Sequence, residues 1–217
     1  MTETLGMTPS RWQIAKRKQE FRGESFANVV RVVGVLAFYV IEIVNHHGST
    51  LLGMPAVVGR DLHAMVTALV GSWVGAALLT VATMRLRYFP IWLKYVTTGV
   101  DLALMTAVLA VLDGPRSPML VGFFLVLALS ATRFSQRLVA CTGVGALACY
   151  GVLLWHTMAL RPALGVPRYH QLIFGLALAI LAAVLVVMIN AAQRIVVALD
   201  SAPNSTFPER SSGESES

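Results

Sequence analysis

Ionisable and amide side chains gather at the ends of long apolar stretches in this chain. They are Glu42, Asn45, His46, His47, His63, His156 and His170. Histidine is the commonest metal ligand and the side chain whose charge changes near neutral pH. The carboxylate, amide and imidazoles of the segment IEIVNHHG can therefore bind a metal ion or respond to pH. His46 and His47 of this segment, with His63 at the start of the next apolar stretch, are the candidate metal ligands.

Asp101 is the other chemically unusual residue, because it lies near the middle of the apolar stretch 89–112. An acidic side chain at the centre of a bilayer costs roughly 2.5–3.5 kcal/mol to insert. We therefore expect Asp101 to face the interior of a helix bundle, where it is protonated or hydrogen-bonded. Thr97, Thr98 or a polar group on another helix is the expected partner, and Lys94 could reach Asp101 only by stretching.

The composition indicates which elements position these residues. Apolar residues make up 56% of the 217 residues and charged residues only 13%, whereas soluble proteins have roughly 45–50% and 25%. The apolar residues form blocks, and a helix needs about 20 residues to cross the hydrocarbon core. Because backbone groups in lipid must be satisfied internally, we predict an all-α bundle of six transmembrane helices. The predicted spans are 27–47, 62–84, 89–112, 118–134, 138–160 and 171–194.

The basic residues predict the orientation of these helices. Thirteen of the 17 lysines and arginines, Arg31 and Arg133 among them, lie on one side of the predicted bundle: before the first span, in the even-numbered loops, in the parts of the spans next to these segments, or after the sixth span. By the positive-inside rule both termini are then cytoplasmic, as in a multi-pass protein of a bacterial inner membrane. The net charge of +6 is therefore an orientation signal, and no nucleic-acid-binding motif accompanies it. Residues 1–26 form a basic cytoplasmic segment, 27–199 the transmembrane domain and 200–217 a disordered tail.

This topology places all five histidines, with Glu42 and Asn45, in one layer at the outer ends of the helices. Three interpretations stay open. Histidines at an interface can simply tolerate water, they can form a pH- or metal-responsive cluster, or two of them can ligate a b-type haem from facing helices. The first interpretation requires no cofactor, the second requires at most a metal ion, and the third requires haem b.

Catalytic motifs are absent from the sequence, which has no phosphate-binding lysine loop, no G-x-S-x-G, no H-E-x-x-H and no C-x-x-C. We therefore do not expect an enzyme. Small residues recur at four-residue spacing in Gly71 and Gly75, in Thr142 and Ala146, and in the series starting at Gly175. Such spacing lets helices approach closely, either within one bundle or in a homodimer.

The segment DGPRSP joins the third and fourth predicted spans, and the fourth span ends in LALSATRFSQR. With an acid-bearing third helix, this pattern resembles the six-helix membrane input domain of bacterial sensor histidine kinases and nucleotide cyclases. In that family a Gly-Gly-x-x-Ser-Pro-like tip is common. Gly114, Ser117 and Pro118 match it, whereas Asp113 stands at the first glycine. Proline also suits the first turn of a helix in any protein. The family's catalytic output domain has no counterpart in this sequence.

The sequence therefore predicts a membrane sensory or anchoring module. It would detect a small ligand, pH or a metal and signal through helix packing to a separate partner such as a kinase or cyclase. A small-solute transport or binding subunit is the first alternative, and a b-type haem or quinone protein is the second. The signal, the partner and the oligomeric state are beyond what the sequence determines.

Overall fold

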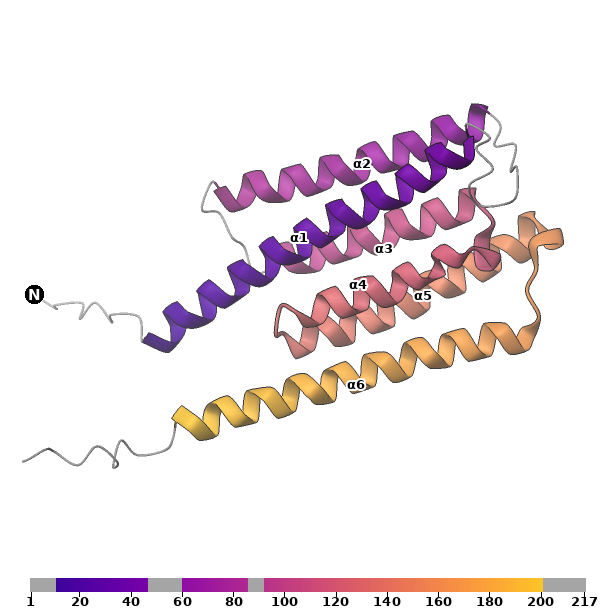
Figure 1. Cartoon of the computed structure of the whole chain (residues 1–217). Coiled ribbons are helices and arrows are strands. Elements are labelled where there is room, and N and C mark those ends of the chain that lie inside the picture. The colour runs from indigo at the N-terminus through magenta and orange to yellow at the C-terminus, as the bar shows by residue number, and fades with distance from the viewer. Residues whose placement is uncertain (1–10, 47–59, 86–91, 201–217) are drawn as a thin grey trace, which may run out of the picture.

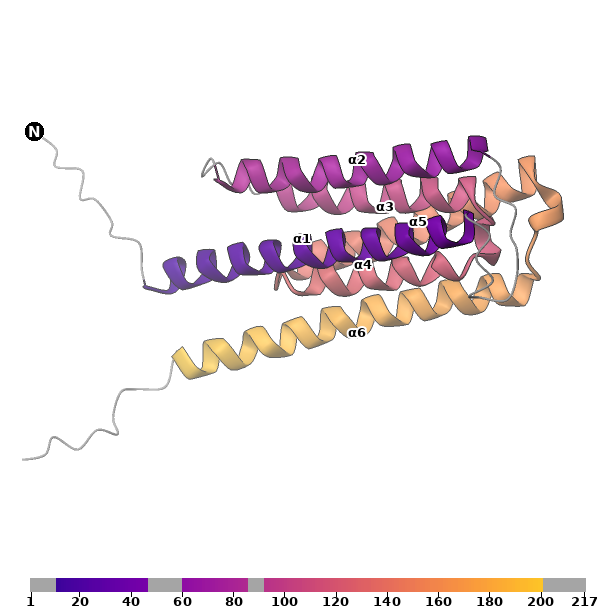
Figure 2. The same cartoon turned by 45° about the horizontal axis from the view of Figure 1, so that its top comes forward.

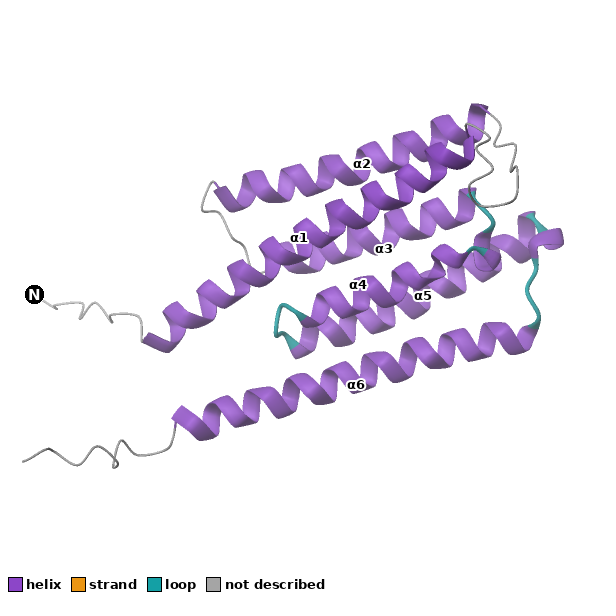
Figure 3. Cartoon of the chain, viewed as in Figure 1, coloured by secondary structure: helices purple, strands orange, loops and turns teal. Residues whose placement is uncertain are grey.

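The computed structural model describes residues 11–46, 60–85 and 92–200. Within these ranges the chain is helical and has no β-strand. The helices are α1 (Arg11–His46), α2 (Arg60–Arg85), α3 (Leu93–Val111), α4 (Val121–Ala131), α5 (Gln136–Leu160) and α6 (Arg168–Asp200), with short 3₁₀ turns before α4 and α6. The all-α prediction is thus confirmed for the described residues, and Figure 3 shows how little of this part is loop.

The helices run side by side along one common direction, as Figures 1 and 2 show from two angles. α3 packs against α2, α4 and α5, while α6 packs against α4 and α5. α1 lies beside α2 and crosses in front of α3 (Figure 1). Large apolar side chains of α3, α4 and α5, such as Leu109, Phe123 and Leu153, are fully buried between these helices. α3 is therefore the central helix of the bundle.

Among the described residues, five helical segments are long and apolar enough to cross a bilayer. They are Gly23–Ile41, His63–Thr83, Leu93–Val111, Gln136–Leu160 and Arg168–Ile195. The outer surface of the bundle is rich in exposed aliphatic side chains, including Leu78, Leu79 and Leu172, as lipid contact requires. A multi-pass membrane protein is the class that this combination of length and surface supports.

The fourth predicted span is shorter than expected. The sequence suggested 118–134, whereas the apolar helical segment is Pro118–Ala131. Phe134 has a φ of 49°, in the left-handed region, and its turn leads directly into α5. Proline and glycine did not signal this end. After Ala131 the chain becomes polar, in Thr132, Arg133, Ser135 and Gln136, and it reverses direction before α5.

The two terminal helices extend beyond the predicted spans. α1 begins at Arg11 rather than near residue 27, so much of the basic segment 1–26 is helical. α6 continues to Asp200. The first turns of α1 and the end of α6 project from the same end of the bundle, past the ends of α3, α4 and α5 (Figures 1 and 2). The predicted tail from 201 onward lies outside the described residues.

Candidate functional site

Asp101 is buried at the centre of the bundle and is held by two other helices. Its Oδ2 lies 2.7 Å from Nη2 of Arg31 on α1, in an ion pair that also has hydrogen-bond geometry. Its Oδ1 accepts a 2.9 Å hydrogen bond from the indole Nε1 of Trp73 on α2. Arg31 and Asp101 are each only 7% exposed. The acid therefore faces the interior as expected, and its partners lie on other helices rather than at Thr97 or Thr98.

Arg31 is tied to its own helix as well. Its Nη1 donates a 2.8 Å hydrogen bond to Oδ1 of Asn28, and Nδ2 of Asn28 donates to the carbonyl oxygen of Ala77 on α2 at 3.3 Å. Nε of Arg31 is buried and has no hydrogen-bond partner among the described residues.

A second buried ion pair lies nearer the beginning of α1. Nη2 of Arg133 donates to Oε1 of Glu24 at 2.9 Å. Nε lies 2.8 Å from Oε2, close enough for an ion pair although its N–H is not aligned for a hydrogen bond. Nη1 donates to Oγ1 of Thr98 at 2.6 Å and to the carbonyl oxygen of Lys94 at 2.9 Å. Arg133 thus joins the turn after α4 to both α1 and α3.

The two ion pairs lie on one stripe of α1. Glu24, Asn28 and Arg31 have i, i+4 and i+7 spacing, so they share a helix face. Glu24 and Arg31 are separated by about 10 Å along the axis, from a rise of about 1.5 Å per residue. From the sequence, Arg31 and Arg133 counted only among the basic residues that indicate orientation, and Glu24 and Asn28 were not predicted site residues. The spacing was visible, but basic residues near the inner end of a span usually reach the interface.

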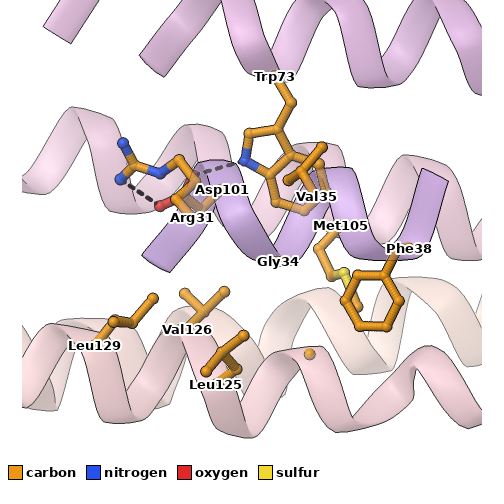
Figure 4. A pocket seen from close by; sticks show the side chains of 11 residues that line it. Arg31, Gly34, Val35, Phe38, Trp73, Asp101, Met105, Leu125, Val126 and Leu129 are labelled. Carbon is orange, nitrogen blue, oxygen red and sulfur yellow. Dashed lines mark hydrogen bonds and ion pairs between the residues drawn. The ribbon is translucent and has the colours of Figure 1, made fainter. Parts of the chain in front are cut away.

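A small cavity of about 30 Å³ lies next to the central ion pair. Arg31, Asp101 and Trp73 form its polar and aromatic wall, and the remaining lining is apolar except for two glycines, Gly34 of α1 and Gly122 at the start of α4. In Figure 4 the α4 side chains Leu125, Val126 and Leu129 lie across from the ion pair. A Cβ at Gly122 would overlap the Met105 side chain, so this glycine permits close packing of α3 on α4.

The predicted histidine layer is only partly described. The ends of α1 and α5 and the starts of α2 and α6 lie at the same end of the bundle, as predicted (Figures 1 and 2). His63 stacks on Tyr39 of α1 at 6.4 Å between ring centroids, and His170 meets Tyr169 edge-on at 4.4 Å. His156 on α5 is half-buried. No group of three metal-ligating side chains lies together in the described residues.

The remaining members of that layer cannot be placed. His47 lies outside the described residues, and the side chains of Glu42, Asn45 and His46 are outside the described part as well. The triad His46, His47 and His63 therefore stays a prediction, and so does haem ligation. Of the predicted polar residues, Asp101 is the one whose complete surroundings the structure gives.

The hairpin tip has a structural role that its residue types explain. Gly114 is buried with a φ of 58°, a conformation in which glycine carries no steric penalty. Oγ of Ser117 accepts a 3.2 Å hydrogen bond from the amide N of Met119, and Pro118 occupies the first position of the turn Pro118–Leu120. Asp113 is exposed and caps no turn with its side chain.

Two arginines fasten this tip to the connection between α5 and α6. Arg116 donates to the carbonyl oxygen of Gly165 at 2.9 Å. Arg161 donates to the carbonyl oxygens of Val111 and Leu112, both at 3.2 Å. The two bonds from Arg161 satisfy carbonyl groups at the end of α3 that have no partner within the helix.

Small residues at four-residue spacing behave in two ways. Thr142 and Ala146 are buried inside the bundle. At the neighbouring Gly143 a Cβ would lie 2.7 Å from Cβ of Ala182, so α5 packs closely on α6 at this glycine. Gly71 and Gly75 face outward, and a Cβ at either would have no neighbour within 4 Å. The α5 pair is thus internal packing, while a homodimer through α2 stays a prediction.

Comparison with known proteins gives no relative for this chain: no protein-family model, no curated protein and no solved structure matches it.

Proposed function

We propose that this protein is a membrane sensory or anchoring module whose central ion pair sets the packing of α1 and reports it at the cytoplasmic ends of α1 and α6. The observation that carries the proposal is the Arg31–Asp101 pair, which is buried, links α1 to α3 and is joined by Trp73 of α2. Ionisable residues inside membrane spans are expensive and mark functional sites more often than not.

The proposal includes six spans with both termini in the cytoplasm. Pro118–Ala131 has a length of about 21 Å at 1.5 Å per residue, shorter than a hydrocarbon core of about 30 Å. Non-helical backbone at membrane depth is tolerated where protein covers it. At the two ends of the short span, arginine side chains form hydrogen bonds to neighbouring segments of the protein. Arg116 bonds to Gly165 before the span, and Arg133 bonds to Lys94 and Glu24 after it.

The excess of basic residues on the proposed cytoplasmic side remains when the buried arginines are left out of the count. Arg31 and Arg133 are buried in ion pairs, so their charges are compensated within the bundle. Removing them from the thirteen inner basic residues leaves eleven, against four outer ones. The difference still favours cytoplasmic termini.

The ion pairs are suited to a two-state response because they form the polar connections from α1 to α3 and to the turn after α4, whereas α1 otherwise packs mainly against α2. Neutralising Asp101, or supplying a competing partner for Arg31, removes the Arg31–Asp101 attraction, while the contacts of Glu24 with Arg133 and Thr97 remain. A packed interface then changes between discrete arrangements rather than deforming gradually. α1 carries such a change beyond the bundle, toward a separate kinase, a cyclase or a second copy of the chain.

The space beside Asp101 favours this reading over the passage of a solute at that position. The cavity beside Asp101 is narrow, at about 30 Å³, whereas pockets that enclose drug-sized ligands are about 300–1,000 Å³. A site of this size can sense a small group but offers little room for the passage of a solute.

The experiment that tests the proposal measures the distance between the inner ends of α1 and α6 in lipid nanodiscs. Spin labels are placed at Ser25→Cys and Ala191→Cys, both at exposed positions, after Cys141 and Cys149 are replaced by alanine. Asp101→Asn removes the carboxylate charge with little change of shape. We expect it to shift the pulsed electron spin resonance distance distribution or add a second population.

Thr106→Val is the matched control, because Oγ1 of Thr106 bonds only its own helix, to the carbonyl oxygen of Leu102 at 2.6 Å. Trp73→Phe removes one hydrogen bond to Asp101 and keeps the ion pair, so it should give a smaller change and covers the case in which Asp101→Asn does not fold. Distributions identical to wild type in both Asp101→Asn and Trp73→Phe would overturn the coupling.

A further inference from the structure

A pocket of about 350 Å³ lies at the end of the bundle where the chain passes from α5 to α6. Its wall combines Pro115 of the hairpin tip, Leu120 just before α4, Tyr150 of α5, Val166 of the connection and one face of α6. The tip contacts both α5 and the connection, at the same end of the bundle (Figure 1). Small-molecule sites have volumes of about 300–1,000 Å³ and mostly apolar walls with a few polar groups. This pocket has the size of such a site.

The α6 face of the pocket arranges polar and apolar groups in order along the helix. His170, Ile173, Phe174 and Ala177 have i, i+3, i+4 and i+7 spacing, so they share one side of α6. His170 is in the first turn, and Ala177 lies about 10 Å further along the axis at a rise of 1.5 Å per residue. His170 and Ile173 are exposed, so the pocket opens at the surface. An occupant therefore needs a polar group near His170 and an apolar body toward Ala177.

Tyr150 supplies a hydrogen-bond donor that the protein leaves unused. The residue is 6% exposed, and its ring packs on Phe174 at 4.6 Å between centroids. Its hydroxyl has no hydrogen-bond partner among the described residues, and unlike Nε of Arg31 this group is not closed off from solvent. Buried tyrosine hydroxyls usually have a partner. The hydroxyl of Tyr150 can therefore donate to an acceptor in the pocket.

Basic side chains next to the pocket favour an acidic occupant. Arg116 lies in the tip, and Arg161 and Arg168 lie at the two ends of the connection. None of the three forms an ion pair with another described residue. Asp113 is the one acidic residue of the tip and the connection, which together have three arginines and a formal charge of +2. Such surroundings attract anions and repel cations.

We propose that this pocket binds an amphipathic monocarboxylate, whose carboxylate accepts hydrogen bonds from the Tyr150 hydroxyl and the His170 imidazole. Both donors border the same part of the pocket, because His170 is one helical turn from Phe174, on which Tyr150 packs. The apolar body then lies along Ile173 and Ala177. At about 30 Å³ per water-sized group, the pocket admits roughly a dozen such groups, the size of a medium-chain or arylalkyl acid.

This site is separate from the ion pair around Asp101. The role of the acid as the detected ligand rests on the proposed sensory function, whereas its binding does not. In the proposed topology the pocket lies at the outer end of the bundle, so the acid reaches it from outside the cell or from the outer leaflet.

The test measures binding of radiolabelled decanoate to the full chain in phosphatidylcholine nanodiscs, with empty nanodiscs as the background. Unlabelled decanoate and methyl decanoate are the competitors, because the ester keeps the apolar body and removes the charge. We expect saturable binding of decanoate and an ester that competes about tenfold more weakly, the effect of weakening hydrogen bonds to a charged group.

Two pairs of variants locate the binding. Tyr150→Phe removes the hydroxyl and keeps the ring, so it should weaken binding about tenfold. Tyr169→Phe is its control, because Tyr169 is exposed and does not line the pocket. Ala177→Leu should fill the inner part of the pocket and weaken binding at least as strongly. Ala183→Leu is its control, since Ala183 is exposed on the same helix outside the pocket. Both controls should bind like wild type.

Three outcomes would overturn the inference: binding no greater than to empty nanodiscs, an ester that competes as well as the acid, or equal affinities in Tyr150→Phe and Tyr169→Phe. Circular dichroism checks that each variant folds, and the comparison of acid with ester in wild type decides the matter if one does not. A failure here is distinct from a failure of the proposed function. Decanoate binding is measured with the Arg31–Asp101 pair intact, whereas the distance between α1 and α6 is measured in Asp101→Asn without any ligand.

Discussion

Replacing Asp101 by leucine tests whether the central ion pair stabilises the bundle. The substitution removes the counter-charge of Arg31, which is 7% exposed, and the acceptor of Trp73 Nε1. Removing one partner of a buried pair costs about 3–5 kcal/mol, because the other charge stays buried and unpaired. We expect a loss of this size, well above the 0.6–1.7 kcal/mol typical of hydrogen bonds between membrane helices.

The double substitution Arg31→Met and Asp101→Leu separates the charge from the rest of the site. It leaves no unpaired charge, so its remaining cost is the loss of partners for Asn28 Oδ1 and Trp73 Nε1, about 0.6–1.7 kcal/mol for each bond. The double variant should therefore be more stable than Asp101→Leu alone. Asp101→Asn should resemble Asp101→Leu, since an amide can still accept from Trp73 but does not compensate Arg31.

The assay is reversible unfolding in mixed micelles, followed by far-ultraviolet circular dichroism as the denaturing detergent is increased. A double-mutant cycle over the four proteins gives the interaction free energy between Arg31 and Asp101. A double variant at least as unstable as each single one, or a loss below about 1 kcal/mol for Asp101→Leu, would refute the account of a charge compensated inside the bundle.

Three further results are expected from positions with sharply defined surroundings. Gly23→Ala should destabilise the bundle by about 1–3 kcal/mol in the unfolding assay described above, because its Cβ would lie 2.8 Å from the carbonyl oxygen of Thr132. Gly75→Ala, with open space around the added Cβ, should be neutral or stabilising in that assay. Gly114→Ala should cost about 1–2 kcal/mol in thermal stability, since its φ of 58° strains a side chain. Cysteines placed in the 161–168 loop should react with an impermeant reagent in intact cells, and labelling at 133–137 instead would reverse the proposed orientation.

The sequence by itself determined the helical class and where along the chain the apolar helices lie. Blocks of apolar residues separated by short polar segments leave the backbone few alternatives in lipid, and the described helices fall on the predicted stretches. Lengths were less predictable. The end of α4 at Ala131 lies at the start of a polar turn, three residues before the predicted end of the span, whereas the start of α1 at Arg11 lies well before the apolar block, where hydropathy does not mark it.

Asp101 could be recognised from the sequence because an acidic side chain in the middle of a transmembrane span is costly to insert, whichever helices surround it. Its role in packing could also be inferred, since it had to face the interior. The hairpin residues were recognisable for a similar reason: Gly114, Ser117 and Pro118 are residue types that turns and first helical turns demand.

Only the tertiary structure decided which groups meet. Arg31 and Asp101 are 70 residues apart, and Glu24 and Arg133 are 109 apart. A basic residue near the end of a span can extend to the lipid interface or turn inward to an acid, and sequence position is the same in both cases. The choice depends on whether neighbouring helices supply a carboxylate at the same depth. Packing α1 across α3 supplies one at Asp101, and it turns Arg31 from a topology signal into the centre of the site.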